Sequence, residues 1–129
     1  MARKEKSQEL WTRGEALERA GQGAEAMEQF VRSALAEEQD GKALRARFLW
    51  EEIARRTGPT GTVLEQLAVT SAGAKLLDDA FDYWRAAQRR YETEGRPEDA
   101  ARAGAHARQL ESKAGPHEVP ALARQVLGD

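Results

Sequence analysis

Three glycines, Gly21, Gly58 and Gly95, recur at intervals of 37 residues and constrain the fold of this 129-residue chain more than any other feature. The segments on both sides of each glycine are rich in alanine, glutamate and arginine, with apolar residues three and four positions apart. Such segments favour amphipathic helices, and glycine ends a helix because it adopts the left-handed conformation without steric cost. The spacing therefore predicts a turn between two helices at each of these glycines.

The same shift of 37 residues aligns further positions of the chain. They are Leu17 with Ala54 and Tyr91 before the turn, and Ala26 with Val63 and Ala100, then Phe30 with Leu67 and Gly104, after it. A fixed period of this length indicates helical hairpins that stack, because one hairpin cannot bury its apolar face alone. We therefore expect an all-α single domain, 1–129, of about three antiparallel hairpins followed by a terminal helix.

Glycine and proline divide the chain into seven expected helices. Their ranges are about 4–20, 23–39, 41–57, 60–71, 74–94, 97–113 and 118–127. The hairpins are then about 4–39, 41–71 and 74–113, and the amphipathic segment 118–127 is expected to cap the apolar flank of the last hairpin. Asp40 and Ser71 are predicted N-caps, because their side-chain oxygens can accept hydrogen bonds from first-turn amides.

The spacing within the units resembles that of tetratricopeptide (TPR) repeats, helix–turn–helix units that stack into a right-handed solenoid. The residues that carry the resemblance are Gly14, Leu17, Gly21, Ala26 and Phe30 in the first unit, Trp50, Ala54, Gly58, Val63 and Leu67 in the second, and Trp84, Ala87, Tyr91, Gly95, Ala100 and Ala107 in the third. The resemblance covers about residues 7–113. Gln88 and Gly104 depart from the family pattern, and the period of 37 residues is longer than the family's.

In the TPR family, the first helix of each hairpin lines a concave face that binds ligands. The resemblance implies these partner-binding positions here: Trp11, Glu15, Arg45, Phe48, Leu49, Glu52, Arg56, Arg85 and Arg89. The implied ligand is a segment of a partner protein, with acidic residues opposite the arginines and an apolar residue near Phe48. In the alternative interpretation, Arg45, Arg85 and Arg89 pair across the stack with acidic residues, namely Glu15, Glu52 and Asp82.

The three tryptophans test the register of this resemblance. Trp50 and Trp84 occupy family positions between paired helices, so we expect them in the core. Trp11 follows an expected core residue, Leu10, by one step, which turns it by about 100° around the helix. We therefore expect Trp11 to be more exposed than the other two.

The composition excludes several kinds of chemistry. The chain has no cysteine, which excludes disulfides, thiolate metal sites and cysteine nucleophiles. His106 and His117 are its two histidines; they lack the spacing of a metal-ligand pair, and we expect both on the solvated surface. No glycine motif that binds phosphate occurs. We therefore expect no enzyme, no metal and no cofactor.

Charge and hydropathy favour a protein partner. With 20 basic and 22 acidic side chains the net charge is −2, so nucleic acid is not the expected partner, although "RKEK" at residues 3–6 keeps it as a third class. No apolar run approaches a membrane span or a secretory signal, which predicts a cytoplasmic protein without membrane contact. The expected function is a monomeric protein–protein interaction or scaffold module, and the alternative is structural self-association through the terminal helix.

Overall fold

The computed structural model describes residues 6–128, and in this range the chain is all helical, as predicted. The helices are α1 (Ser7–Arg19), α2 (Gly23–Gln39), α3 (Ala43–Thr57), α4 (Gly61–Gly73), α5 (Leu77–Thr93), α6 (Pro97–Glu111) and α7 (Ala121–Leu127). Each lies within about three residues of a predicted range. The predicted start of the first helix at residue 4, and most of the "RKEK" segment, lie outside the described residues.

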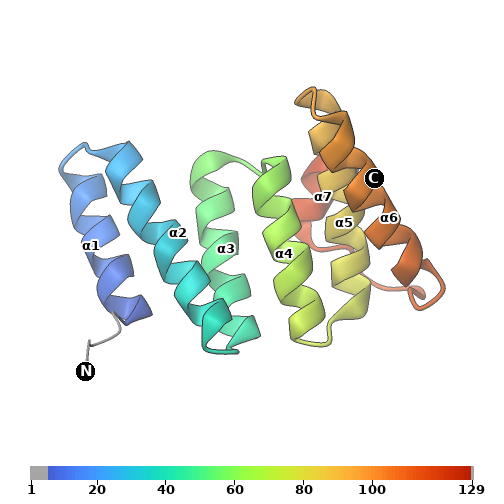
Figure 1. Ribbon diagram of the computed structural model, residues 1–129, viewed down its shortest axis with the longest axis horizontal. Helices are drawn as coiled ribbons and strands as arrows, with labels where there is room; N and C mark the ends of the chain where they lie inside the picture. Colours follow the sequence, from blue (N-terminus) through green and yellow to red (C-terminus); the bar gives the residue numbers. More distant parts are fainter. Residues whose placement is uncertain (1–5, 129) are drawn as a thin grey trace.

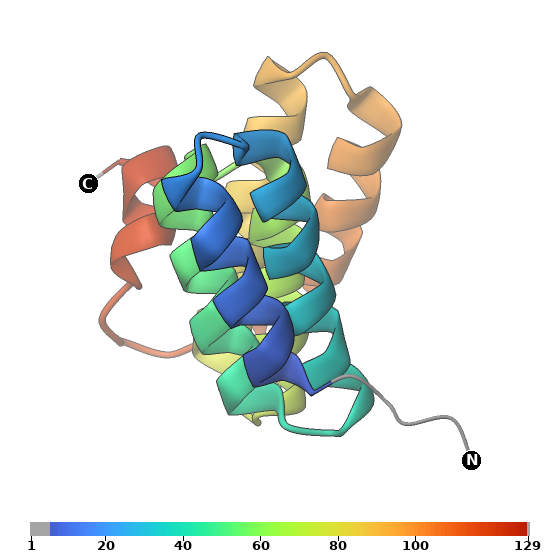
Figure 2. The same ribbon diagram turned by 90° about the vertical axis from the view of Figure 1, so that its left-hand side faces the viewer.

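Helices α1 to α6 stand in a row in chain order, each packed against the next (Figure 1). Three hairpins follow from this order: α1 with α2, α3 with α4, and α5 with α6. Seen along the row, α7 and α6 lie on opposite sides of the molecule (Figure 2). The terminal helix packs on α5, so it covers a different face of the last hairpin from the outer flank that the sequence suggested.

Four of the connections share one turn geometry, and they set the antiparallel course of the helices. In the turns 20–22, 40–42, 74–76 and 94–96, the middle residue has a positive φ between 68° and 79°. The amide of the third residue donates to the carbonyl five positions earlier, at 2.9–3.0 Å in all four turns. This is the Schellman motif, which pairs the last carbonyls of a helix. The next helix begins directly after the bond.

This turn corrects both predicted N-caps. Asp40 is the residue that ends α2, because Gly41 takes the left-handed position after it. Ser71 lies buried inside α4, which continues to Gly73. The side-chain cap that does form is at Thr60, whose Oγ1 accepts from the Val63 amide at 3.3 Å.

Two prolines delay the start of α7 from the predicted residue 118 to residue 121. Pro120 has an extended backbone, with φ −56° and ψ 141°, and directly precedes the helix. A residue before proline is pushed out of the helical region, so Val119 cannot belong to α7. Pro116 acts in the same way on Gly115, in the segment between α6 and α7.

The core lies between the helices of the row and confirms the tryptophan register. Trp50 is 3% exposed and Trp84 is 6% exposed, whereas Trp11 is only partly buried. Phe30, Leu67 and other large apolar side chains fill the space beside them. Helices α1 and α3 both pack on α2, and side chains of all three helices line one surface.

The departures from the repeat pattern at Gln88 and Gly104 compensate each other. In the first hairpin, a Cβ on Gly14 would lie 2.6 Å from the ring of Phe30. At the corresponding positions of the third hairpin the sizes are exchanged, and a Cβ on Gly104 would lie 2.9 Å from the amide of Gln88. A large residue therefore meets a glycine in both hairpins, which allows the same close approach of the helices.

Candidate partner-binding groove

A groove runs between α1 and α3, with α2 as its floor, and has a volume of about 640 Å³. We call it the α1–α3 groove. The predicted partner-binding residues that line it are Trp11, Glu15, Arg45, Phe48, Leu49, Glu52 and Arg56, and the other lining residues are Ser7, Gln8, Ser33, Glu37 and Leu44. The carried-over positions of the first two hairpins therefore do converge on one surface.

The middle of the groove is apolar. Leu44 is 63% exposed and Phe48 is 59% exposed, which makes them the most exposed large apolar side chains in the described part of the chain. They lie four residues apart on α3, and therefore on one face of that helix. Trp11 lines the groove from α1, and its ring packs on Phe30 with centroids 4.3 Å apart.

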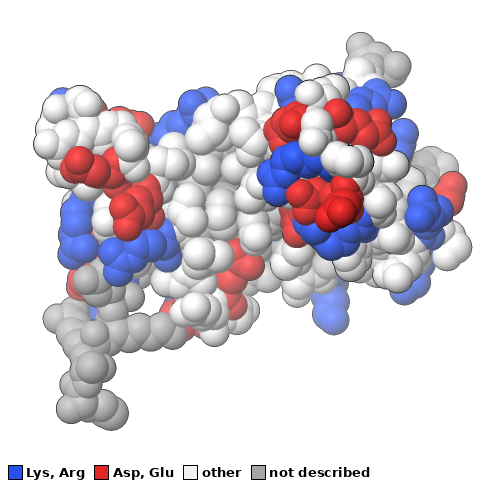
Figure 3. Space-filling view, turned by 45° about the horizontal axis from the view of Figure 1, so that its top comes forward, with Lys and Arg blue, Asp and Glu red and all other residues white. Residues whose placement is uncertain are grey.

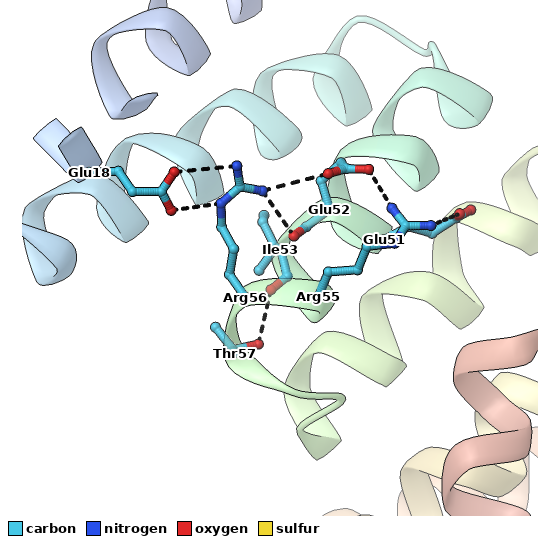
Figure 4. Close-up of polar contacts among 7 residues, drawn as sticks. All are labelled: Glu18, Glu51, Glu52, Ile53, Arg55, Arg56 and Thr57. Atoms are coloured by element: carbon cyan, nitrogen blue, oxygen red, sulfur yellow. Dashed lines mark hydrogen bonds and ion pairs between the residues drawn. The ribbon is translucent and has the colours of Figure 1, made fainter. Parts of the chain in front are cut away.

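One end of the groove is closed by Arg56 of α3 (Figure 4). Its guanidinium bonds to Glu18 of α1 at 2.8 Å and pairs with Glu52 of its own helix at 3.6 Å. The same group lies over the rings of Trp11, at 5.4 Å, and Phe30, at 4.6 Å. Arg56 therefore joins the first two hairpins, through a pair that the sequence analysis did not predict.

The opposite end of the groove is polar and partly buried. Ser7 and Ser33 hold the start of α1 against α2: their hydroxyls are 2.7 Å apart, and Ser33 also donates to the Ser7 carbonyl at 2.8 Å. One turn further along α2, Glu37 is 5% exposed. Within residues 6–128 its Oε2 has no hydrogen-bond partner, and Nε of Arg45 forms an ion pair with it at 3.7 Å.

Sequence reasoning missed Ser7, Ser33, Glu37 and Leu44. The family positions were taken only from first helices, whereas Ser33 and Glu37 lie on the second helix of their hairpin. Their spacing of four residues on the buried face of an amphipathic helix was a usable signal, since polar side chains are uncommon there. Leu44 lies four residues before Phe48, and the same spacing could have identified it.

Arg85 and Arg89 do not line the α1–α3 groove, so their contact with a partner stays a prediction. Both are exposed on α5, where the register does place them on the groove side, but α7 packs on that helix. Arg89 donates to the Leu127 carbonyl at 2.8 Å, and the guanidinium of Arg85 lies 5.5 Å from the ring centroid of Phe81. Arg89 therefore joins α5 to the end of α7, whereas Arg85 contacts a residue of its own helix.

His117 corrects the prediction that both histidines are solvated. Its Nε2 lies 2.5 Å from Oδ2 of Asp82, a carboxylate that is 1% exposed on α5, and its Nδ1 contacts the Gly115 carbonyl. The Gly115 carbonyl and the Asp82 carboxylate raise the pKa of the His117 imidazole. His106 is exposed as expected, with its ring stacked on Trp84 at 4.3 Å.

Elsewhere the charged side chains pair locally. Arg102 of α6 bonds to Glu65 of α4 and to Asp99, both at 2.6 Å, and Arg96 bonds to Asp99 at 2.8 Å. On the face drawn in Figure 3, basic and acidic side chains alternate within the charged patches. The basic side chains on this face therefore do not form a surface of a single charge sign.

Within residues 6–128, no group of three or more acidic or histidine side chains is placed to hold a metal ion. None of the helices in that range has the length and apolar character needed to cross a membrane. In comparisons with protein-family models, with curated proteins and with solved structures, nothing matches the chain. Membership of the TPR family therefore stays a prediction from the spacing of its residues.

Proposed function

We propose that this protein is a TPR-like binding module that holds a segment of another protein in the α1–α3 groove. The observation that carries the proposal is the exposure of Leu44 and Phe48 in one groove with polar ends. Contiguous apolar surface rimmed by polar groups is typical of interaction sites. Burying a leucine or phenylalanine side chain contributes about 1.5–3 kcal/mol, whereas an exposed ion pair contributes about 0.2–1 kcal/mol. Apolar contacts therefore dominate the proposed affinity.

The proposal assigns no chemistry to the groove. Its described lining residues include no histidine, and the hydroxyls of Ser7 and Ser33 are engaged with each other and with backbone carbonyls. A nucleophile needs a general base within hydrogen-bond reach, and neither serine has one among its contacts. Binding is the activity that such a groove can supply.

Self-association through the terminal helix is the weaker candidate. The apolar residues of α7 that this would need include Leu122, which is 9% exposed, and Ala123, which is fully buried against the chain's own core. An interface with a second copy would first have to detach α7 from α5. We therefore propose a monomer with one protein partner.

The proposal is tested with peptides selected from a random displayed library against the purified protein. Replacing Phe48 with serine should lower the affinity for the selected peptides by about tenfold or more. The lost burial is about 1.5–3 kcal/mol, and 1.4 kcal/mol corresponds to a factor of ten in affinity. Leu35→Ser is the matched control, because Leu35 is also an exposed apolar residue but lies on α2 outside the groove. Fluorescence anisotropy measures the affinities. Equal affinity for both variants would exclude the α1–α3 groove.

A further inference from the structure

We infer that the occupant of the α1–α3 groove is an amphipathic helix that presents a lysine or arginine to Glu37 and apolar side chains to Leu44 and Phe48. The inference rests on the proposed function and adds the chemistry of the partner. It reverses the charge that the sequence suggested for the ligand, from acidic to basic.

The buried carboxylate of Glu37 is the first reason. Burying a charge without a hydrogen-bonded partner is unfavourable, and native structures rarely retain such a group without a role. Glu37 is 5% exposed and lines the groove, yet its Oε2 accepts no hydrogen bond. An ammonium or guanidinium group entering the groove would supply the missing donor.

Arg45 does not already fill this role. Its Nε lies 3.7 Å from Glu37, beyond hydrogen-bond distance, and its side chain is 66% exposed. Because the Arg45 side chain is mostly in solvent and makes no hydrogen bond to Oε2 of Glu37, an incoming cation can take its place beside that carboxylate.

The remaining charges of the groove also favour a cation. Its lining residues include the carboxylates of Glu15, Glu37 and Glu52, but only the guanidinium groups of Arg45 and Arg56. Arg56 is held by Glu18 and Glu52. Among the described residues Glu15 has no ion pair, so the net charge available to a ligand is negative.

The chain's own terminal segment shows the class of occupant that this surface accepts. The shift of 37 residues that relates α1, α3 and α5 places Gln8, Arg45 and Asp82 at one position and Trp11, Phe48 and Arg85 at another. On α5 this face holds a short apolar helix, α7. The segment leading into α7 brings His117 onto Asp82, a buried carboxylate. In the α1–α3 groove the buried carboxylate comes from a different element, Glu37 of α2, and within residues 6–128 no helix covers it and no cation is hydrogen-bonded to its Oε2.

The spacing of the groove residues fits a helix. Leu44 and Phe48 are separated by one helical turn, about 6 Å along α3, which matches the spacing of i and i+4 side chains on a facing helix. Glu37 lies beside Arg45, the residue that follows Leu44, since Oε2 of Glu37 is 3.7 Å from Nε of Arg45. The basic residue of the occupant should therefore stand about one turn beyond its apolar pair.

The experiment is a selection from a displayed library of randomised helical peptides against three folded proteins. They are the wild type, Glu37→Gln, and Glu28→Gln as the control on the exposed face of α2. Peptides enriched on the wild type and on Glu28→Gln should carry a lysine or arginine one turn from an apolar pair. Peptides enriched on Glu37→Gln should keep the apolar pair and lose the preference for a basic residue.

A selected peptide then tests the contact directly. Replacing its basic residue with norleucine should weaken binding to the wild type about tenfold, which corresponds to about 1.4 kcal/mol. The same replacement should change binding to Glu37→Gln by less than twofold. Thermal unfolding followed by circular dichroism checks that Glu37→Gln is folded, as expected for a variant that loses an unpaired buried charge.

The outcomes separate this inference from the proposed function. Peptides that need Phe48 but show no basic preference, or prefer an acidic residue there, would overturn the inference and leave the proposed function intact. Peptides that bind equally well without Phe48, or a selection that enriches none, would overturn both.

Discussion

At the scale of single residues, Lys75 is in the greatest conflict with its backbone. It occupies the left-handed position of the turn between α4 and α5, with φ 68°, where the other three turns of this type have glycine. The sequence suggested a break at Gly73 instead, because a glycine stood there. The turns after α1, α2 and α5 have the same geometry with glycine at this position. The turn after α4 keeps that geometry although lysine is poorly suited to the left-handed conformation.

Lys75→Gly should therefore stabilise the protein. Relief of the left-handed strain gains about 1–2 kcal/mol, and the greater freedom of glycine in the unfolded chain offsets about 0.4–1 kcal/mol of this. We expect a net gain of about 0.5–1 kcal/mol in the free energy of unfolding, measured by urea denaturation. Gly41→Lys, at the equivalent position of the second turn, should destabilise the protein. A loss of stability in Lys75→Gly would show that the lysine side chain has a role of its own.

The groove shows what residue patterns can and cannot predict. The resemblance to TPR repeats implied groove-facing positions for Trp11, Phe48 and Leu49, and all three line the groove. The pairing of Arg56 with Glu18, 38 residues away, did not follow, since long side chains choose partners by tertiary geometry. Glu37 was missed because it lies on the second helix of its hairpin.

At the scale of elements, α7 is the helix whose existence the sequence predicted and whose location it did not. Its apolar spacing indicated an amphipathic helix, and the structure has one at Ala121–Leu127. The contact that directs the segment toward α5 joins His117 to Asp82, 35 residues apart. No local pattern marks such a pair, because each residue alone is compatible with a solvated surface.

The docking of α7 should depend on pH. Both ring nitrogens of His117 contact acceptors, the Gly115 carbonyl and the Asp82 carboxylate, so both contacts need the doubly protonated ring. These acceptors raise the pKa of His117. The two contacts therefore contribute fully to the docking of α7 below the unfolded-state pKa of about 6.5. This contribution is lost as the pH rises through the raised pKa of the folded state. Asp78 adds to the negative field around the ring.

Amide hydrogen exchange of α7 measures this effect, with the intrinsic pH dependence of exchange removed. Protection should fall in the wild type as the pH rises above the unfolded-state pKa of about 6.5 and through the raised pKa of the folded state. The same fall should be absent in His117→Gln and unchanged in His106→Gln, in which the other histidine is replaced. A fall of equal size in all three proteins would place the pH dependence elsewhere.

At the scale of the whole molecule, the repeat register is what the sequence predicted best. The stack of hairpins, the turns near Gly21, Gly58 and Gly95, and the division between buried and groove-facing positions all derive from one period. Periodicity is informative here because every unit must bury its apolar face against its neighbours. The docking of α7 on α5 breaks the period and could not be derived from it.

Tryptophan truncation tests that register in solution. Trp84→Ala should lower the free energy of unfolding by about 3–5 kcal/mol, because Trp84 is almost fully buried between helices. Trp11→Ala should lower it clearly less, since Trp11 is only partly buried at the groove. Chemical denaturation followed by circular dichroism compares the two variants. Equal losses would contradict the burial pattern of the stack.

The position of α7 on α5 also bears on how many partners the proposed binding module would hold at once. A helix joined to its site by a short segment of the same chain faces it at an effective concentration on the order of millimolar. A free helix with the same intrinsic affinity, present at about micromolar concentration, would compete about a thousandfold less well. We therefore expect α7 to keep the surface of α5 closed to ordinary competitors. Under the proposed function, the protein would hold one partner at a time, in the α1–α3 groove.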